Sequence, residues 1–407
     1  MNKNIKLGLI VAGLFLLSIV APLAAMPTKA QTTDTITVAV DLSHGESDKY
    51  LDYIMSNITF VNWVVFDGQN LSITPENLSN VDVLILGQPT VGFSPDEMDA
   101  IYNWLVSGNK VLWVAGDSDY GSGWQTQEYV NDLLEYIGAK LRIEYASFYD
   151  DYHNCQRFYR VLVHMAVDDY PELETSIISQ NITKPILAHG PAPLIWVDDT
   201  GTPHDITNET FPGLIRILWS YDTAYIGDNN PPAPMLYDPL FYGQGSGNHT
   251  FVFLAAEYWE DVHSLVVVSG ESPYGDYEPG FAWEYYGVQL DGPQYVTNMI
   301  TWFNTLILQI WPSMETTTTT TETTTTTTQT TTTTTEETTT TTTQEQTSTT
   351  TTTTTEQTTT TTTGQQTTEE TTTTEQTTEE GGINTGLLVA VVVIIIIIIA
   401  GAFALRK

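Results

Sequence analysis

The sequence predicts a mixed α/β protein built on an open, mostly parallel β-sheet with helices on both faces. Short runs of aliphatic and β-branched residues, such as residues 81–86 and 110–115, have the length and composition of buried strands. A helix with clear start and stop signals separates these two strands, which is the pattern of a right-handed βαβ crossover. The same alternation of strand and helix extends over residues 35–146, and an alternating order of this kind is typical of a parallel sheet covered by helices.

The first elements are a strand, a helix and a second strand. Residues 35–41 (TITVAVD) alternate and are rich in β-branched residues, so they predict a strand. Residues 47–57 carry apolar side chains at helical spacing and predict a helix. Residues 60–66 predict the next strand.

The clearest element is the helix that begins after Ser94. Pro95 occupies its first position and Glu97 stands three residues after Ser94, which together predict a capping box with proline at the first helical position. Gly108 supplies the stop. A further helix at 126–137 and a strand at 140–146 continue the pattern.

The periodic pattern is lost between residues 148 and 245, where Pro, Gly, Asp and aromatic residues dominate. We interpret this stretch as an insertion of loops and small antiparallel strands, with strand candidates at 158–166, 185–188 and 193–197. Regular structure returns with predicted strands at 250–256 and 263–269 and a closing helix at 293–310.

Both ends of the chain predict an exported, membrane-anchored protein. Residues 1–30 have the basic start, short apolar run and small residues of a signal peptide, although an uncleaved N-terminal anchor is an alternative. The predicted ectodomain covers residues 31–312. Threonine dominates the segment 313–382, which predicts a flexible or O-glycosylated stalk. Residues 383–405 have the length and apolarity of a transmembrane helix, and the basic residues 406–407 predict a cytoplasmic end. The expected location is therefore the cell membrane, crossed once, with the ectodomain outside.

The composition narrows the possible partners. The chain has 49 acidic residues against 13 Lys and Arg, so nucleic acid is not an expected partner. The excess of acids leaves two interpretations open, cation binding or an acidic environment. Cys155 is the only cysteine, which excludes an intrachain disulfide and favours a buried thiol. Six N-x-[ST] sequons lie in the predicted ectodomain: Asn57, Asn70, Asn77, Asn181, Asn208 and Asn248.

Several of these runs resemble a known superfamily. The runs at 81–87, 93–97 and 104–117, with the first loop at 41–45, resemble the class I glutamine-amidotransferase-like superfamily. More closely they resemble a branch shared with gliding-motility transporter accessory proteins and intraflagellar-transport-like domains. The segments 265–271 and 295–303 resemble the last strand and helix of that branch. This resemblance implies a flavodoxin-like sheet. It also implies a cysteine nucleophile after the strand at 111–115, but the turn there is Gly116-Asp117-Ser118, so glutamine hydrolysis is not expected.

Ligands of open parallel sheets bind beyond the carboxyl ends of the strands. This rule predicts a ligand-binding rim formed by loop residues that follow the strands: His44, Glu46, Gln88, Asp117, Ser118, Asp119, Glu257 and Glu271. The alternative is that they are turn and cap residues.

Three kinds of chemistry are conceivable for these residues. Ser118 as a nucleophile with His44 or His263 as base would make a hydrolase, but the second glycine of the usual elbow is missing. The run from Asp117 to Glu128 resembles a calcium loop only poorly, so we expect no cofactor and keep Ca²⁺ as a minor alternative. The seven histidines show no ligand spacing, so no metal site is expected.

We therefore expect a non-catalytic binding or structural module that is held at the cell surface. Its partner would be a glycan, a peptide, a surface-layer protein or a transporter, and the many Tyr and Trp residues suit such recognition. Two alternatives from other classes are an extracellular solute-binding receptor of an ABC transporter and a surface-tethered hydrolase.

Overall fold

The computed structural model describes residues 35–314. The predicted signal peptide (1–30), almost all of the predicted stalk (313–382), the predicted membrane helix (383–405) and the tail (406–407) lie outside the described residues. Within residues 35–314, no helix is long and apolar enough to cross a lipid bilayer.

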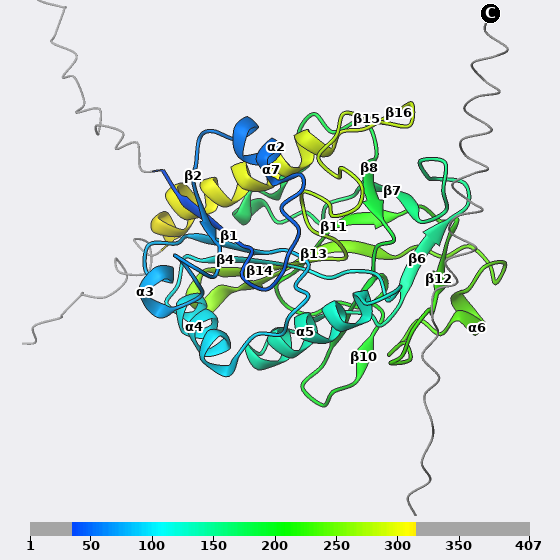
Figure 1. The fold of residues 1–407 in the computed structure, drawn as a ribbon, viewed down its shortest axis with the longest axis horizontal. Helices are drawn as coiled ribbons and strands as arrows, with labels where there is room; N and C mark the ends of the chain where they lie inside the picture. Colours follow the sequence, from blue (N-terminus) through cyan, green and yellow to red (C-terminus); the bar gives the residue numbers. More distant parts are fainter. Residues whose placement is uncertain (1–34, 315–407) are drawn as a thin grey trace, which may run out of the picture. The chain divides into compact units, whose positions relative to one another are not determined.

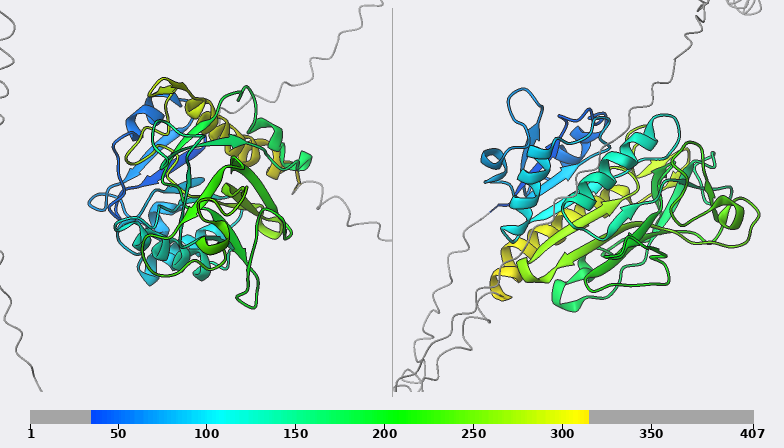
Figure 2. Two further views of the ribbon diagram at one scale, coloured as in Figure 1. Left: turned by 90° about the vertical axis from the view of Figure 1, so that its right-hand side faces the viewer. Right: turned by 90° about the horizontal axis from the view of Figure 1, so that it is seen from below.

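A nine-stranded sheet in the order β2-β1-β3-β4-β14-β13-β11-β7-β8 forms the centre of the fold (Figure 1). One half is parallel and consists of β2 (Asn62–Phe66), β1 (Thr37–Asp41), β3 (Val83–Leu86), β4 (Val111–Ala115) and β14 (Ser264–Ser269). The other half is antiparallel and consists of β13 (Val252–Trp259), β11 (Leu214–Ser220), β7 (Arg160–Met165) and β8 (Ile186–His189). In Figure 2 the blue and cyan strands of the parallel half and the green strands of the antiparallel half lie on opposite sides.

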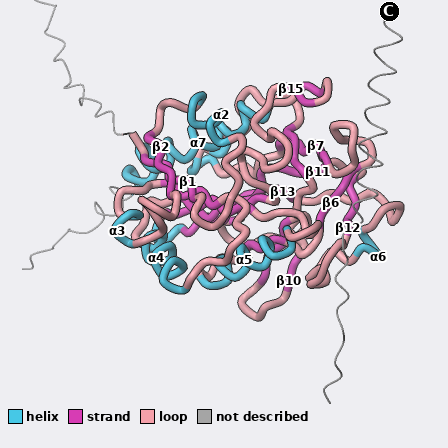
Figure 3. Tube along the Cα trace, viewed as in Figure 1, coloured by secondary structure: helices cyan, strands magenta, loops and turns pink. Residues whose placement is uncertain are grey.

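The predicted mixed α/β class and the parallel half are confirmed, and the predicted strands match β1–β4 and β14 closely. The interpretation of residues 148–245 as a separate insertion is wrong in one respect. That segment does contain small antiparallel strands, and loops make up much of the rest of it (Figure 3). However, β7, β8 and β11 from this segment extend the central sheet itself. The sheet is therefore parallel only as far as β14.

Helices cover both faces of the parallel half. The helices α2 (Leu51–Asn57) and α7 (Gly292–Thr305) lie on one face, and α3 (Pro75–Leu78), α4 (Pro95–Val106) and α5 (Gly123–Tyr136) lie on the other (Figure 1). The last helix continues through a π-helical turn, η4 (Leu306–Ile310). A hydrophobic core lies on each face of the sheet, and alternate residues of a strand point into one core or the other. Val111 and Trp113 of β4 belong to the core that includes α7, whereas Leu112 and Val114 belong to the core that includes α4 and α5.

The predicted start of α4 is confirmed. The Ser94 hydroxyl accepts a hydrogen bond from the Glu97 N–H, and the Glu97 carboxylate accepts one from the Ser94 N–H. This reciprocal capping satisfies two N–H groups that the first helical turn would otherwise leave unpaired.

Smaller strands pack around the antiparallel half. β5 (Leu141–Ile143), β9 (Leu194–Val197) and β10 (Pro203–His204) form a three-stranded sheet, and β6 (Ser147–Asp150) pairs with β12 (Ala224–Gly227). A hairpin of β15 (Glu284–Tyr285) and β16 (Val288–Gln289) precedes α7, and the short helices η1 (Pro171–Leu173), η2 (Thr175–Ile177), η3 (Glu260–Val262) and α6 (Pro239–Tyr242) lie in connecting loops.

Buried carboxylates hold several of the connecting loops. Glu144 accepts hydrogen bonds from the N–H groups of Met235, Leu236 and Tyr237, at 2.6, 2.8 and 2.9 Å. Asp291 accepts bonds from Thr183 and Lys184 in the same way. Because a chain with one cysteine cannot use disulfides, charge-assisted bonds of this kind fix its loops to the core.

Candidate functional site

The carboxyl ends of β1, β3, β4 and β14 meet at one edge of the sheet, as the parallel register requires. The loops that follow these strands bring together His44, Glu46, Gln88, Asp117 and Glu271. We call this set the acidic edge. Every member except Asp117, which is half-buried, has less than a tenth of its surface exposed.

The first loop forms the tightest part of the acidic edge. Asp41 is the last residue of β1 and is fully buried, and its Oδ2 lies 2.6 Å from His44 Nδ1. The His44 N–H donates to Glu46 Oε2 at 2.9 Å, and His44 Nε2 lies 3.4 Å from Glu97 Oε2. The ring of Phe93 covers the imidazole at 4.4 Å between ring centroids.

Burial and like charges shift the proton equilibria of this loop. Burial lowers the pKa of His44, but the hydrogen bond to Asp41 and the charges of Asp41, Glu46 and Glu97 outweigh it, so the pKa is raised overall. Burial also raises the pKa of Glu46, and the neighbouring charge of Asp41 adds to this effect.

The remaining loops connect to this one through polar contacts. The Ser272 N–H faces Gln88 Oε1 at 3.4 Å, and Gln88 also interacts with Asp117. Burial raises the pKa of Asp117 to about 7, and burial raises that of Glu271 well above its usual range. Glu271 accepts a hydrogen bond from the His189 N–H at 2.7 Å, which joins the end of β14 to the end of β8.

Two of the predicted rim residues are engaged elsewhere. Asp119 is fully buried and accepts hydrogen bonds from Ser147 Oγ and from Asn229 and Asn230, so it fixes a loop rather than facing Asp117. In the minor alternative of a calcium loop from Asp117 to Glu128, Asp119 would have been the second ligand, and these hydrogen bonds occupy it. Glu257 accepts bonds from the N–H groups of Lys140 and Leu141. Its placement at the rim was wrong because β13 runs antiparallel, which carries the end of that strand to the opposite edge.

The serine–histidine pair considered for a hydrolase does not form. Ser118 lies beside Gly190, at the end of β8. His44 is bonded to Asp41 and Glu97, whereas His263 Nδ1 lies 2.7 Å from the Tyr258 hydroxyl at the far end of β14. In residues 35–314, neither imidazole hydrogen-bonds to Ser118.

The structure also places residues that sequence reasoning missed next to the acidic edge. The loop 272–280 carries Tyr274, Tyr277 and Glu278. Glu278 forms an ion pair with Arg160 at 2.7 Å, and its other carboxylate oxygen lies 3.0 Å from His189 Nε2. The run Tyr274-Gly-Asp-Tyr-Glu278 was visible in the sequence as an aromatic and acidic cluster, but no pattern indicated that it faces β1 and β8. Asp41 was visible too, since D-x-x-H-x-E follows directly from a predicted strand.

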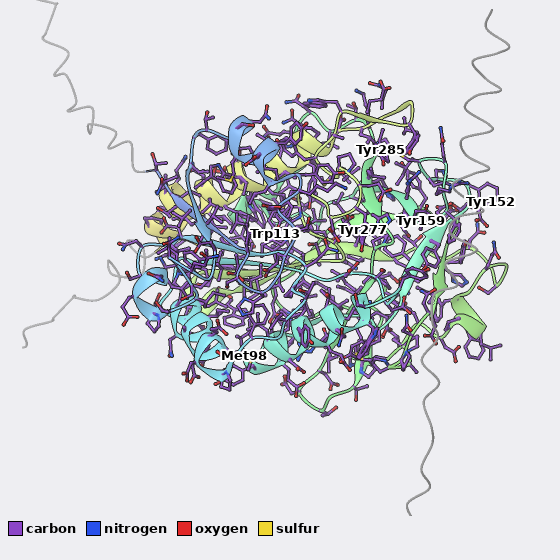
Figure 4. The ribbon with its side chains drawn as sticks, viewed as in Figure 1. Met98, Trp113, Tyr152, Tyr159, Tyr277 and Tyr285 are labelled. Carbon is purple, nitrogen blue, oxygen red and sulfur yellow. The ribbon has the colours of Figure 1, made fainter. Side chains whose placement is uncertain are left out.

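Tyrosines surround the Arg160–Glu278 pair. The guanidinium of Arg160 lies 4.6 Å from the ring of Tyr286, 5.5 Å from Tyr159 and 5.7 Å from Tyr285. The imidazole of His189 lies between Tyr159 and Tyr277, at 5.5 and 5.1 Å. We call these four tyrosines the tyrosine platform, and three of them are labelled in Figure 4. Tyr277 and Tyr286 are 65 and 51 % exposed, so the platform faces solvent.

Five of the six sequon asparagines are exposed: Asn57, Asn70, Asn181, Asn208 and Asn248. Asn77 is half-buried in α3, and its side-chain amide donates to the Ser72 carbonyl at 2.8 Å. Glycosylation of the five exposed residues therefore stays a prediction, whereas at Asn77 it requires that this hydrogen bond break.

No protein-family model matches the chain, and no curated protein matches it. Among solved structures, the chain is similar to the N-terminal domain of mmIFT52, with 13% identity, a TM-score of 0.41, and coverage of 66% of this chain and 97% of that one. It is also similar to a ThuA-like protein from Bacteroides uniformis (11% identity, TM-score 0.35, coverage 68% and 94%). A third is the glutaminase domain of Trypanosoma brucei CTPS (13% identity, TM-score 0.29, coverage 66% and 94%). These structures include an intraflagellar-transport domain and a glutaminase domain, two of the three kinds of protein that the sequence resembles, at low identity.

Proposed function

We propose that the protein is a carbohydrate-binding module of the cell surface, and that the tyrosine platform is its recognition surface. The observation that carries this proposal is the exposure of aromatic rings around a charged centre. Tyr277 and Tyr286 are more than half exposed, although burying such rings would stabilise the fold. An exposed group of rings next to fixed polar groups is typical of an interaction surface.

The chemistry of the platform suits a sugar. A pyranose presents C–H faces that pack on aromatic rings, and hydroxyl groups that bond to charged side chains. Arg160 and His189 offer polar groups among these tyrosines, and the buried Glu278 carboxylate holds Arg160 in place through their ion pair. Because these groups are ordered before the ligand arrives, little conformational entropy is lost on binding.

The charge of the chain favours a neutral glycan over an acidic one. The formal net charge is −36, so an anionic polysaccharide would be repelled at long range. A peptide, a surface-layer protein or a transporter subunit remains within the same class of binding function, and so does a solute receptor. The predicted stalk and membrane anchor would present this surface away from the cell.

The test is a binding titration of the full-length chain against neutral oligosaccharides, followed by isothermal calorimetry. Tyr277→Ala and Tyr286→Ala are each expected to weaken binding about tenfold, the loss of about 1.4 kcal/mol that one exposed ring contact supplies. The control is Tyr152→Ala, since Tyr152 is 80% exposed and lies outside the platform (Figure 4). An equal loss in the Tyr152 variant, or no saturable binding by the unaltered chain, would contradict the proposal.

A further inference from the structure

The loop after β1 gathers three side chains that can act as metal ligands. Asp41, His44 and Glu46 each offer one ligand atom, and these atoms all lie within 4.8 Å of one another. Both carboxylates and the imidazole are more than nine-tenths buried. The loop is held in place, because the His44 carbonyl accepts hydrogen bonds from the N–H groups of Thr90 and Val91 at 2.9 and 3.1 Å.

Two buried oxygen atoms at this loop have no hydrogen-bond partner within residues 35–314. One is Glu46 Oε1, and the other is the hydroxyl of Tyr274, a residue that is 1% exposed. The two side chains lie against the same residue, Gly87, where a Cβ atom would overlap the Tyr274 hydroxyl and approach Glu46 Cγ to 3.2 Å. Burying a polar atom without a partner costs about 1–3 kcal/mol, so two such atoms at one place indicate a missing polar ligand.

The space available selects among ligands. Both unpartnered atoms are shielded from solvent, so a sugar or a peptide cannot reach them without rearrangement of the loop. A single ion, with or without one water, is small enough. The charge has the right sign too, because two carboxylates share the loop with only one imidazole to neutralise them.

We propose that Asp41, His44 and Glu46 bind a divalent transition-metal ion such as Zn²⁺, and that the Tyr274 hydroxyl hydrogen-bonds to a water on that ion. An imidazole with two carboxylates suits Zn²⁺ and its first-row neighbours, whereas Ca²⁺ prefers a shell made only of oxygen. His44 Nδ1 and Asp41 Oδ2 lie 2.6 Å apart, at hydrogen-bond distance, and in the proposed site the ion replaces the hydrogen bond between them. Bonds of about 2.0–2.2 Å separate neighbouring ligand atoms by about 3.4 Å. On binding, Asp41 Oδ2 and His44 Nδ1 therefore have to move apart from 2.6 Å, and Glu46 has to draw in from within 4.8 Å.

This site is independent of the tyrosine platform. It lies at the end of β1, and none of its three ligands contacts Tyr277 or Tyr286 through a hydrogen bond in the described residues. The experiment accordingly uses metal ions alone and no glycan, so failure of one proposal leaves the other standing.

The test is calorimetric titration of the full-length chain with Zn²⁺, Mn²⁺ and Ca²⁺, after treatment with a chelator. One Zn²⁺ site per chain is expected, with weaker binding of Mn²⁺ and much weaker binding of Ca²⁺. His44→Gln and Glu46→Gln are each expected to lower the Zn²⁺ affinity by at least about tenfold, and Tyr274→Phe by less, because it removes only a contact to the bound water.

The matched control is His204→Gln. His204 also lies between two carboxylates, Asp198 and Glu209, but its two nitrogens face them separately and its side chain is half-buried. Its replacement is expected to leave the affinity unchanged. Equal Zn²⁺ binding by the His44 variant, or loss of the site in the His204 variant, would overturn the assignment.

A second measurement does not depend on any variant folding. X-ray absorption of the Zn²⁺-loaded unaltered chain is expected to show one imidazole and otherwise oxygen ligands. A shell of oxygen alone, a shell with two or more imidazoles, or a sulfur ligand would overturn the proposal.

Discussion

Replacing Asp117 by asparagine is expected to stabilise the protein at neutral pH and to change its stability little near about pH 4. The reason is the burial of the Asp117 carboxyl at the end of β4, which raises its pKa from the usual 3.8 to about 7. In the unfolded chain the carboxyl ionises freely once the pH exceeds about 4. Between these two values the native state binds more protons than the unfolded state, so the stability of the protein falls as the pH rises.

The magnitude follows from the difference between the two pKa values. Each pKa unit corresponds to about 1.4 kcal/mol, so a difference of roughly three units corresponds to about 4 kcal/mol. Two features reduce this figure. Asp117 is only half-buried, and its carboxylate lies beside Gly123 at the start of α5, where the helix dipole favours a negative charge. We therefore expect Asp117→Asn to raise the free energy of unfolding by about 2 kcal/mol near pH 8.

Asparagine is a suitable replacement because its side-chain oxygen can still accept the hydrogen bond from the Ser118 N–H, which Asp117 Oδ1 accepts at 2.6 Å. Urea denaturation of the variant and the unaltered full-length protein, at about pH 4 and at about pH 8, gives the difference in their free energies of unfolding at each pH. The expected result is that the two proteins are about equally stable at the lower pH and that the variant is more stable at the higher pH. A variant that is less stable than the unaltered protein near pH 8, or a difference that does not change with pH, would refute this reasoning.

Three further predictions concern the fold. Ser94→Ala removes the hydroxyl that caps α4 and is expected to lower the free energy of unfolding by about 1 kcal/mol in urea denaturation, whereas Ser94→Asp should keep it. Glu144→Ala leaves the N–H groups of the 235–237 loop unpaired and is expected to cost at least about 3 kcal/mol; a loss below about 1 kcal/mol would show that water replaces the carboxylate. Cys155 is fully buried, and burial raises the pKa of its thiol to about 11, so a thiol reagent should label it only when the chain unfolds. Rapid labelling of the native protein would contradict this.

The parallel half of the sheet could be predicted because its signals are local. Each strand from β1 to β4 is a short apolar run, and the capping box at Ser94 marks the start of α4 without reference to anything distant in the chain. Predicting the antiparallel half instead requires knowing which strands pair with one another over long distances in the chain. The strands β7 and β8 were visible as candidates, but nothing in their sequence indicates that β11 separates them from β13. Leu214–Ser220 itself was overlooked within a stretch of turns and aromatic residues.

The candidate site was predictable to the extent that strand direction was known. The rule for parallel strands brought His44, Glu46, Gln88, Asp117 and Glu271 to one edge, as the structure has them. The same rule failed for Glu257, because it assumes a parallel strand.

The contribution of Tyr274 and Glu278 was not predictable. The positions of these two side chains depend on how the 272–280 loop packs near the end of β1. This packing is determined by contacts between residues more than 200 positions apart in the chain. The hydrogen bond from Lys49 Nζ to the Tyr277 carbonyl, between residues 228 positions apart, is one of the contacts that fix this loop.

The position of β14 between β4 and β13 has a consequence for how the chain acquires its structure. β14 completes the parallel half, yet its contact with β4 joins residues such as Lys110 and Ser264, which are 154 positions apart. During synthesis, β1 to β4 therefore emerge first, and the edge of β4 that later pairs with β14 stays unpaired until the strands of the antiparallel half have been made. Loops of that length close slowly, and a long-range parallel pairing is a late event in folding. We expect the exposed edge of β4 to be the surface on which the nascent protein is most vulnerable to aggregation, and on which a chaperone would act.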